Sequence, residues 1–300
     1  MASLKDVKVK IVGVGKTKQI TKAMYMVASA KLRGAQSRIE RFRPYAEKFF
    51  DVLGHLAGQA GEVQHPLLQV HKTQEQSLIV LITSDRGLCG SLNVSLIAKG
   101  LDEARARAAK GKRVRFVCIG KKGRDAIQKS GFEIKRYYTP EEDGQGFALA
   151  SHVGHDMMGD YVYHATDEVV LLYPEFRSTA SQIPQVLPLL PVQPAAAAET
   201  VKTDAFDETY PDHGSAPDFL YEPQVGQLLE QLLPTYINVQ IYRALLDTAA
   251  SENAARMVAM DNATRNCDDL IATLTLLYNK TRQSTITSEL IDIVSGANAL

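Results

Sequence analysis

The sequence predicts a mixed α/β fold: a long antiparallel coiled coil of N- and C-terminal helices plus a Rossmann-like α/β domain with a mostly parallel sheet. Two observations support this prediction. Apolar residues repeat in heptads at both ends of the 300-residue chain, and strand-like and helix-like segments alternate between them. The expected parts are a coiled-coil helix at 1–58, the α/β domain at 75–194, a linker at 195–219, and a coiled-coil helix with a projecting tip at 220–300.

The N-terminal segment carries a heptad frame from Leu4 to Leu56, stepping alternately by three and four residues. Lys18 and Thr21 are the polar members of this frame. Such a long frame is typical of a coiled-coil seam and not of an ordinary surface helix. We expect fraying or bending at three poor helix formers, which are Gly13, Gly15 and Pro44.

The middle of the chain alternates between strands and helices. The expected strands are Leu78–Thr83, Val114–Ile119, Phe132–Tyr138, Glu168–Tyr173 and Gln185–Leu190. Helices are expected up to about Lys110, at Lys121–Lys129 and at 146–164. This alternation predicts a largely parallel sheet. Residues 191–219, rich in Pro, Ala and Asp, look like a loose linker.

The C-terminal segment has a similar frame that runs from Val225 to Tyr278, after a helix start at Glu222-Pro223. An antiparallel alignment with Leu56 beside Val225 places Leu4 beside about residue 277. The C-terminal helix would then continue alone for about twenty residues, roughly 30 Å. The same alignment puts the two helix prolines, Pro44 and Pro234, near one level. The alternative is two independent amphipathic helices packed on a core.

Composition restricts the class of protein. Residues 1–58 hold twelve basic and four acidic side chains, whereas residues 220–300 hold five and nine, so the two ends attract each other or different partners. The three cysteines form no CxxC pair, which fits a reducing cytosol and argues against a zinc site. We expect neither a signal peptide nor a membrane span.

Several patterns suggest chemistry weakly. The loop Ser84–Gly90 follows the first strand, where doubly wound folds bind phosphates, but it lacks the GxGxxG and GxxxxGK[ST] patterns. Cys89 has no histidine placed to activate it. Asp156, Asp160 and His164 have metal-ligand spacing, which a solvated helix face also produces. The basic N-terminal helix lacks the interleaved aromatic residues of a nucleic-acid site, so no nucleic acid, metal or cofactor is expected.

The segment Tyr278–Glu289 is polar all round once the heptad frame ends. A lone polar helix is a poor independent structure. It is reasonable if another protein encloses it, and the donors and acceptors for that protein would then be Arg282, Gln283, Thr287 and Glu289. The alternative is a frayed tail.

Four stretches resemble the gamma subunit of F-type ATP synthases. They are Ile20–Val27 with Ala30-Lys-Leu32, Asp85–Gly90, Ala250–Met260 with Ala263-Thr264, and Ile286-Thr-Ser-Glu289 followed by Gly296-Ala297. The last stretch fits the family signature, which opens with Ile-Thr-x-Glu and closes with Gly-Ala. The resemblance covers both ends of the chain and the start of the middle domain, and region 140–220 matches loosely.

The resemblance implies a central rotary shaft of the F1 sector, which couples proton flow to ATP synthesis or hydrolysis at the beta subunits and has no catalytic residue. Implied partners are the alpha, beta and epsilon subunits and the c-ring, with one copy of the chain per complex. By motif, Lys22 and Met24 face the beta lever region. Arg282, Gln283, Thr287 and Glu289 grip the beta subunits, and Tyr221 and Glu222 face epsilon and the c-ring.

The resemblance also implies a peripheral location on the cytoplasmic face of a bacterial plasma membrane. Gly13 and Gly15 stand where the family usually has better helix formers, and no regulatory cysteine pair of the chloroplast type is present. Two competing interpretations are a nucleotide-binding α/β enzyme with helical arms and a generic coiled-coil scaffold. Tight binding of ATP to the isolated chain favours the enzyme, and copurification with two larger ATPase subunits favours the shaft.

Overall fold

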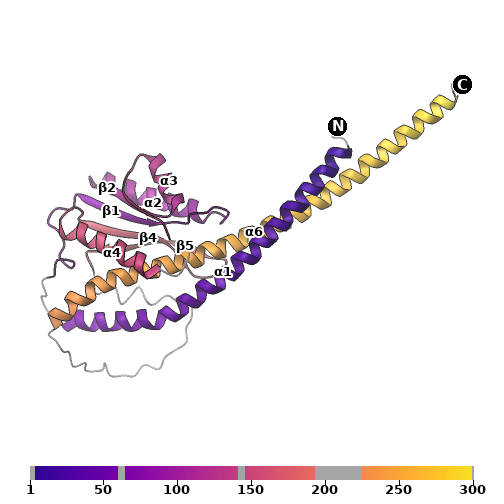
Figure 1. The fold of residues 1–300 in the computed structure, drawn as a ribbon. Coiled ribbons are helices and arrows are strands. Elements are labelled where there is room, and N and C mark those ends of the chain that lie inside the picture. Colours follow the sequence, from indigo (N-terminus) through magenta and orange to yellow (C-terminus); the bar gives the residue numbers. More distant parts are fainter. Residues whose placement is uncertain (1–3, 60–64, 141–145, 193–224, 299–300) are drawn as a thin grey trace. The chain divides into compact units, whose positions relative to one another are not determined.

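The computed structural model describes residues 4–59, 65–140, 146–192 and 225–298 (Figure 1). These residues form two compact units. Unit 1 comprises Met1–Ala30 and Arg256–Leu300, and unit 2 comprises Lys31–Ala255. Helix α1 (Leu4–Gln59) and helix α6 (Val225–Asn298) each contribute to both units.

Unit 2 contains a five-stranded sheet in the order β3-β2-β1-β4-β5. The expected strands and helices are present, with bounds that differ by a few residues from those predicted. The strands are β1 (Gln76–Ile82), β2 (Arg113–Ile119), β3 (Glu133–Tyr138), β4 (Glu168–Phe176) and β5 (Gln182–Leu190), and the helices between them are α2 (Leu92–Ala109), α3 (Lys121–Ser130) and α4 (Gly146–Val162). Strands β1 to β4 are parallel, and β5 pairs antiparallel with β4. The predicted fold class is confirmed.

Strand β1 is apolar along its length because both of its faces are covered. Its side chains alternate between two cores: Leu78, Val80 and Ile82 belong to one, and Ile79 and Leu81 to the other. The first core includes residues of α4 and of both long helices, and the second includes residues of α2 and α3. This is the layered packing that a parallel sheet requires.

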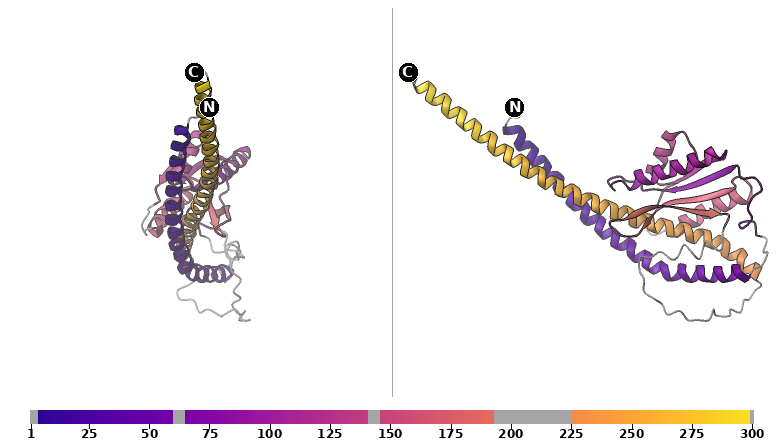
Figure 2. Two further views of the ribbon diagram at one scale, coloured as in Figure 1. Left: turned by 90° about the vertical axis from the view of Figure 1, so that its right-hand side faces the viewer. Right: turned by 180° about the vertical axis from the view of Figure 1, so that it is seen from behind.

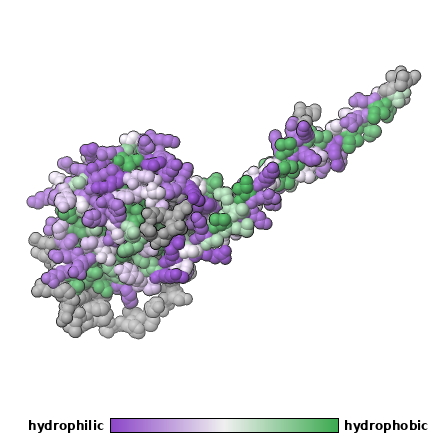
Figure 3. Space-filling model, viewed as in Figure 1, coloured by the Kyte–Doolittle hydropathy of each residue, from purple (hydrophilic) through white to green (hydrophobic). Residues whose placement is uncertain are grey.

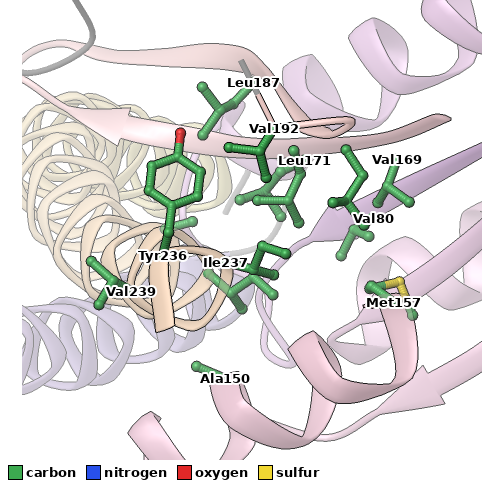
Figure 4. Packing of buried hydrophobic residues seen from close by; sticks show 14 of the residues in the cluster. Val80, Ala150, Met157, Val169, Leu171, Leu187, Val192, Tyr236, Ile237 and Val239 are labelled. Atoms are coloured by element: carbon green, nitrogen blue, oxygen red, sulfur yellow. The ribbon is translucent and has the colours of Figure 1, made fainter. Parts of the chain in front are cut away.

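The first core joins the sheet to the long helices (Figure 4). Leu171 of β4, Met157 of α4 and Ile237 of α6 point toward one another there, and each is completely buried. Burying a side chain of this size stabilises a protein by about 1.5–3 kcal/mol. The part of α6 in unit 2 is therefore an integral element of the α/β domain.

Aromatic contacts between α1 and α6 fix their alignment inside unit 2. The rings of Phe42 and Tyr242 meet edge to face at 4.8 Å, and those of Phe50 and Tyr236 at 5.7 Å. This alignment places Pro44 level with about residue 241, roughly 10 Å along the helix from Pro234. The prediction that the two prolines lie at one level is wrong.

Within the residues that the structure describes, no helix is long and apolar enough to cross a membrane.

Candidate partner interface

Unit 1 is a pair of helices built from the first and last described residues of the chain. Thr21 Oγ1 and Thr264 Oγ1 lie 2.8 Å apart, and the Lys18 ammonium donates a hydrogen bond to the Asp268 carboxylate. The seam between the helices also buries Val7, Ala28 and Met260. The polar interruption of the N-terminal heptad frame, Lys18 and Thr21, therefore meets polar partners on α6.

The predicted register of this pair is wrong by about one helical turn. Alignment of the heptad frames placed Thr21 beside about residue 260, whereas the structure pairs it with Thr264. A heptad frame advances by three or four residues at each step, so a shift of about four residues preserves the apolar seam. As a result, Thr281 and Thr285 are half-buried, and the fully exposed tip begins after Thr285 instead of after Tyr278.

The threonine pair predicts a coupled effect on stability. Each hydroxyl also approaches a backbone oxygen of its own helix, that of Lys18 at 3.0 Å or Met260 at 2.8 Å. We expect Thr21→Val and Thr264→Val each to cost about 1 kcal/mol, and the double variant to cost less than their sum. Hydrogen exchange of the amides around Thr21 and Thr264 measures this. Strictly additive losses would contradict a direct bond between the hydroxyls.

The four predicted tip residues, Arg282, Gln283, Thr287 and Glu289, are all exposed. Helical geometry places Arg282 and Glu289 on one side of α6, two turns apart, and Gln283 and Thr287 about 100° or more further around. The hydroxyl of Thr287 donates to the Gln283 carbonyl oxygen at 2.8 Å, so it is already used within the helix. The structure thus divides the four residues between two faces.

Apolar side chains at the tip were missed by the sequence analysis, which treated the tip as polar. Ile286, Leu290, Ile291, Ile293 and Val294 are between 48% and 67% exposed. In Figure 3, hydrophobic and hydrophilic side chains alternate along this part of α6. The run Leu290-Ile-Asp-Ile-Val294 could have revealed this apolar surface in the sequence. It lies beyond the N-terminal end of α1, so no apolar residue of α1 can cover it. Contiguous exposed apolar patches are typical of sites that contact another protein or a membrane.

The N-terminal half of unit 1 presents a second exposed surface. Lys22 is exposed and Met24 is half-buried. Apolar neighbours on the same helix are also exposed, namely Val9, Val12, Ile20, Met26 and Val27. Because Thr21 pairs with Thr264, Lys22 and Met24 lie roughly 30 Å along the helix pair from Arg282. The residues of unit 1 that are predicted to bind partners therefore lie at two separate levels of the helix pair. In both views of Figure 2, α6 continues past the N-terminal end of α1.

Two predicted partner-binding residues, Tyr221 and Glu222, lie outside the described residues, as does the predicted linker at 195–219.

The loop Ser84–Gly90 is a tight turn held by its own side chains. The Asn93 amide donates to Ser84 Oγ at 2.7 Å and to Cys89 Sγ at 3.1 Å, and the Asp85 carboxylate accepts the Lys121 backbone N–H at 2.7 Å. Two donors beside the loop, the Asn93 amide and the Lys121 backbone N–H, are thus already engaged within the protein. Elsewhere, burial raises the pKa of the Cys118 thiol to about 12, so that thiol stays protonated.

The carboxylates with metal-ligand spacing are engaged by cations and a phenol. Tyr138 donates to Asp156, and Lys135 and Arg136 both pair with Asp160. These hydrogen bonds and charges hold the pKa of Asp160 below its ordinary value, although burial opposes them. His164 lies beyond the end of α4 and contacts His71. Across the described ranges, no group of three His, Cys, Asp or Glu side chains is placed to hold a metal.

Comparison with known proteins identifies the family. The family model described as ATP synthase matches residues 3–300. The ATP synthase gamma chain of Nitratidesulfovibrio vulgaris strain Hildenborough is 57% identical over 300 residues, covering all of this chain and 99% of the relative. The chain belongs to the family of ATP synthase gamma chains. The gamma chain of Lawsonia intracellularis, 54% identical with full coverage of both chains, agrees with this assignment.

Solved structures agree with a gamma-chain fold. A chain of the Tetrahymena thermophila mitochondrial ATP synthase central stalk and c-ring is 26% identical, with a TM-score of 0.57, covering 81% of this chain and 99% of that one. A chain from the Euglena gracilis mitochondrial ATP synthase in rotational state 3 is 22% identical, with a TM-score of 0.68, covering 99% and 94%. At that identity the second likeness establishes the fold alone.

Proposed function

We propose that this gamma chain is the central rotary shaft of an F1 sector, coupling proton flow through a membrane sector to ATP synthesis or hydrolysis at beta subunits. The observation that carries the proposal is the helix pair of unit 1, in which the two ends of the chain meet through Lys18–Asp268 and Thr21–Thr264. A shaft transmits torque, and two paired helices resist twisting and bending better than one. Because the chain belongs to the family of ATP synthase gamma chains, we expect this helix pair to work inside an F1 sector.

The exposed surfaces of unit 1 suit a bearing formed by alpha and beta subunits. Arg282, Gln283, Thr287 and Glu289 would grip the beta subunits through polar contacts that can be exchanged as the shaft turns. The exposed apolar residues near Leu290 would add burial at the end of the shaft. Lys22 and Met24 would face the beta lever region at a lower level.

The α/β domain of unit 2 would serve as the foot of the shaft. Tyr221 and Glu222 are proposed to face the epsilon subunit and the c-ring. The division into residues 1–58, 75–194, 195–219 and 220–300 stays a prediction, as do the single copy per complex and the location on the cytoplasmic face of a bacterial plasma membrane. In this role the chain supplies no catalytic residue, and ATP chemistry belongs to the beta subunits.

The double variant Arg282→Ala plus Gln283→Ala tests the gripping role. Both side chains are exposed in unit 1, so the variant removes partner contacts without opening a core. We expect proton-driven ATP synthesis by the assembled complex to fall about tenfold or more, the effect of losing about 1.4 kcal/mol at an interface. Synthesis is measured in sealed vesicles under an imposed proton gradient.

The matched control is Arg105→Ala plus Gln128→Ala, which truncates an exposed Arg and an exposed Gln on α2 and α3. Synthesis should be unchanged in this control. Normal synthesis in the Arg282/Gln283 variant would exclude the gripping role of these two residues.

A further inference from the structure

A pocket of about 450 Å³ lies in unit 2 between α1, α6 and the carboxyl end of β4. Its volume is within the range of small-molecule sites, roughly 300–1,000 Å³. Much of its wall is apolar, formed by Ile39, Phe42, Phe50, Phe176 and Leu246. The pocket plays no part in the helix pairing of unit 1 or in the tip.

The pocket lies at the carboxyl end of β4, next to the position at which open α/β sheets commonly bind ligands, and its lining includes no residue of β1. Strands β2 and β3 follow β1 on one side, and β4 lies on the other, so the strand order reverses between β1 and β4. Open α/β sheets bind ligands outside the carboxyl ends of strands at such a reversal. Glu175 and Phe176, at the carboxyl end of β4, both line the pocket.

Two carboxylates form the most deeply buried polar part of the lining. Glu175 is 6% exposed and accepts a hydrogen bond from Arg177 Nε at 3.2 Å. Asp247 is 8% exposed, and the positive charges that act on its carboxylate are those of Arg243 and Arg43. Burial raises the pKa of Asp247 to about 7, and the positive charges of Arg243 and Arg43 only partly oppose this effect.

The charges around Asp247 leave the pocket with a formal excess of one negative charge. The lining contains four acids and three bases, which are Glu40, Glu47, Glu175 and Asp247 against Arg43, Arg177 and Arg243. Glu175 and Asp247 are buried, Arg243 is half-buried, and Arg43 and Arg177 are exposed. Burying a carboxylate charge is costly, and a cationic hydrogen-bond donor from a ligand would reduce that cost.

We propose that this pocket binds an organic cation with an aromatic or aliphatic body, whose amidine, guanidine or amine group donates hydrogen bonds to the Asp247 carboxylate. The body of the ligand packs against Phe42, Phe50 and Phe176, whose rings attract a cation as well as apolar atoms. Since the ligand touches α1, β4 and α6 at once, it stabilises unit 2 on binding.

The test compares benzamidine with benzamide, its neutral analogue of nearly the same shape, by isothermal titration calorimetry on the full chain at pH 8. We expect benzamidine to bind about tenfold or more tightly than benzamide. Equal affinities would overturn the proposal, because they would indicate an apolar cavity without charge selection. No binding of benzamidine to the folded chain would overturn it as well.

Two further measurements assign the charge selection to Asp247. Asp247→Asn should weaken benzamidine binding about tenfold, while Glu47→Gln at the exposed rim should change it less than about twofold. Binding to the unaltered chain should also weaken about tenfold between pH 8 and pH 6, as Asp247 takes up a proton while benzamidine stays charged. The pH series needs no substitution, and a flat profile would contradict the role of Asp247.

Discussion

Gly120→Ala is expected to destabilise unit 2 by about 4 kcal/mol or more, among the largest losses for a single methyl group in this chain. Gly120 joins β2 to α3 with φ +100° and ψ 144°, a region open almost only to glycine. A β-carbon there would lie 2.1 Å from the Thr83 carbonyl oxygen and 2.8 Å from its carbon. Backbone atoms cannot rotate away, so β1 and α3 would have to separate.

The matched control for this prediction is Gly131→Ala. Gly131 ends α3 with φ +82°, but a β-carbon there meets no atom within 4 Å. Gly131→Ala should therefore lower the free energy of unfolding only by the strain of a left-handed backbone, about 1–2 kcal/mol. Urea unfolding of the full chain, followed by circular dichroism, compares the two variants. Similar losses would show that strain, and not the overlap with Thr83, sets the cost at Gly120.

Tyr161→Ala is expected to cost about 3–5 kcal/mol, because it empties a completely buried aromatic site. The ring of Tyr161 stacks on His71 at a centroid distance of 4.2 Å, and its hydroxyl donates to the Gln69 carbonyl oxygen at 2.6 Å. His71 in turn lies 3.0 Å from the Asp167 carboxylate. The substitution therefore loosens the segment that leads into β1 as well as the core.

Tyr161→Phe separates the ring from the hydroxyl. It keeps the stacking and loses one hydrogen bond, so we expect a cost of about 1 kcal/mol. Hydrogen exchange of the β1 amides, together with urea unfolding, distinguishes the two variants. If Tyr161→Phe were as damaging as Tyr161→Ala, the hydroxyl and not the packed ring would hold this segment.

The α/β domain could be predicted from sequence because its strands carry unambiguous patterns. Both faces of β1 are covered, so Leu78–Ile82 is a continuous apolar run. Such a run identifies a buried strand from the sequence alone. The existence of the helix pair was equally readable, because Val7, Ala28 and Met260 fall on the heptad frames and are buried.

The register of the helix pair could not be predicted from the same frames. Each step of a heptad frame offers an equivalent seam, and the choice depends on contacts such as Thr21–Thr264 that have no sequence signature. The pocket was also missed, because Glu175 and Asp247 are 72 positions apart in the sequence and meet only through the packing of β4 on α6. Long-range packing, unlike local periodicity, leaves no pattern in one sequence.

Rotation of single complexes tests the central claim most directly. The complex is fixed through its beta subunits, and a bead is attached through Tyr163→Cys, a position that is 84% exposed on unit 2. Cys267→Ser removes the half-exposed native thiol, while Cys89 and Cys118 are buried. If this chain is the shaft, the bead should rotate in one direction when ATP is added. Steady ATP hydrolysis with a stationary bead would contradict the assignment of this chain as the rotor shaft.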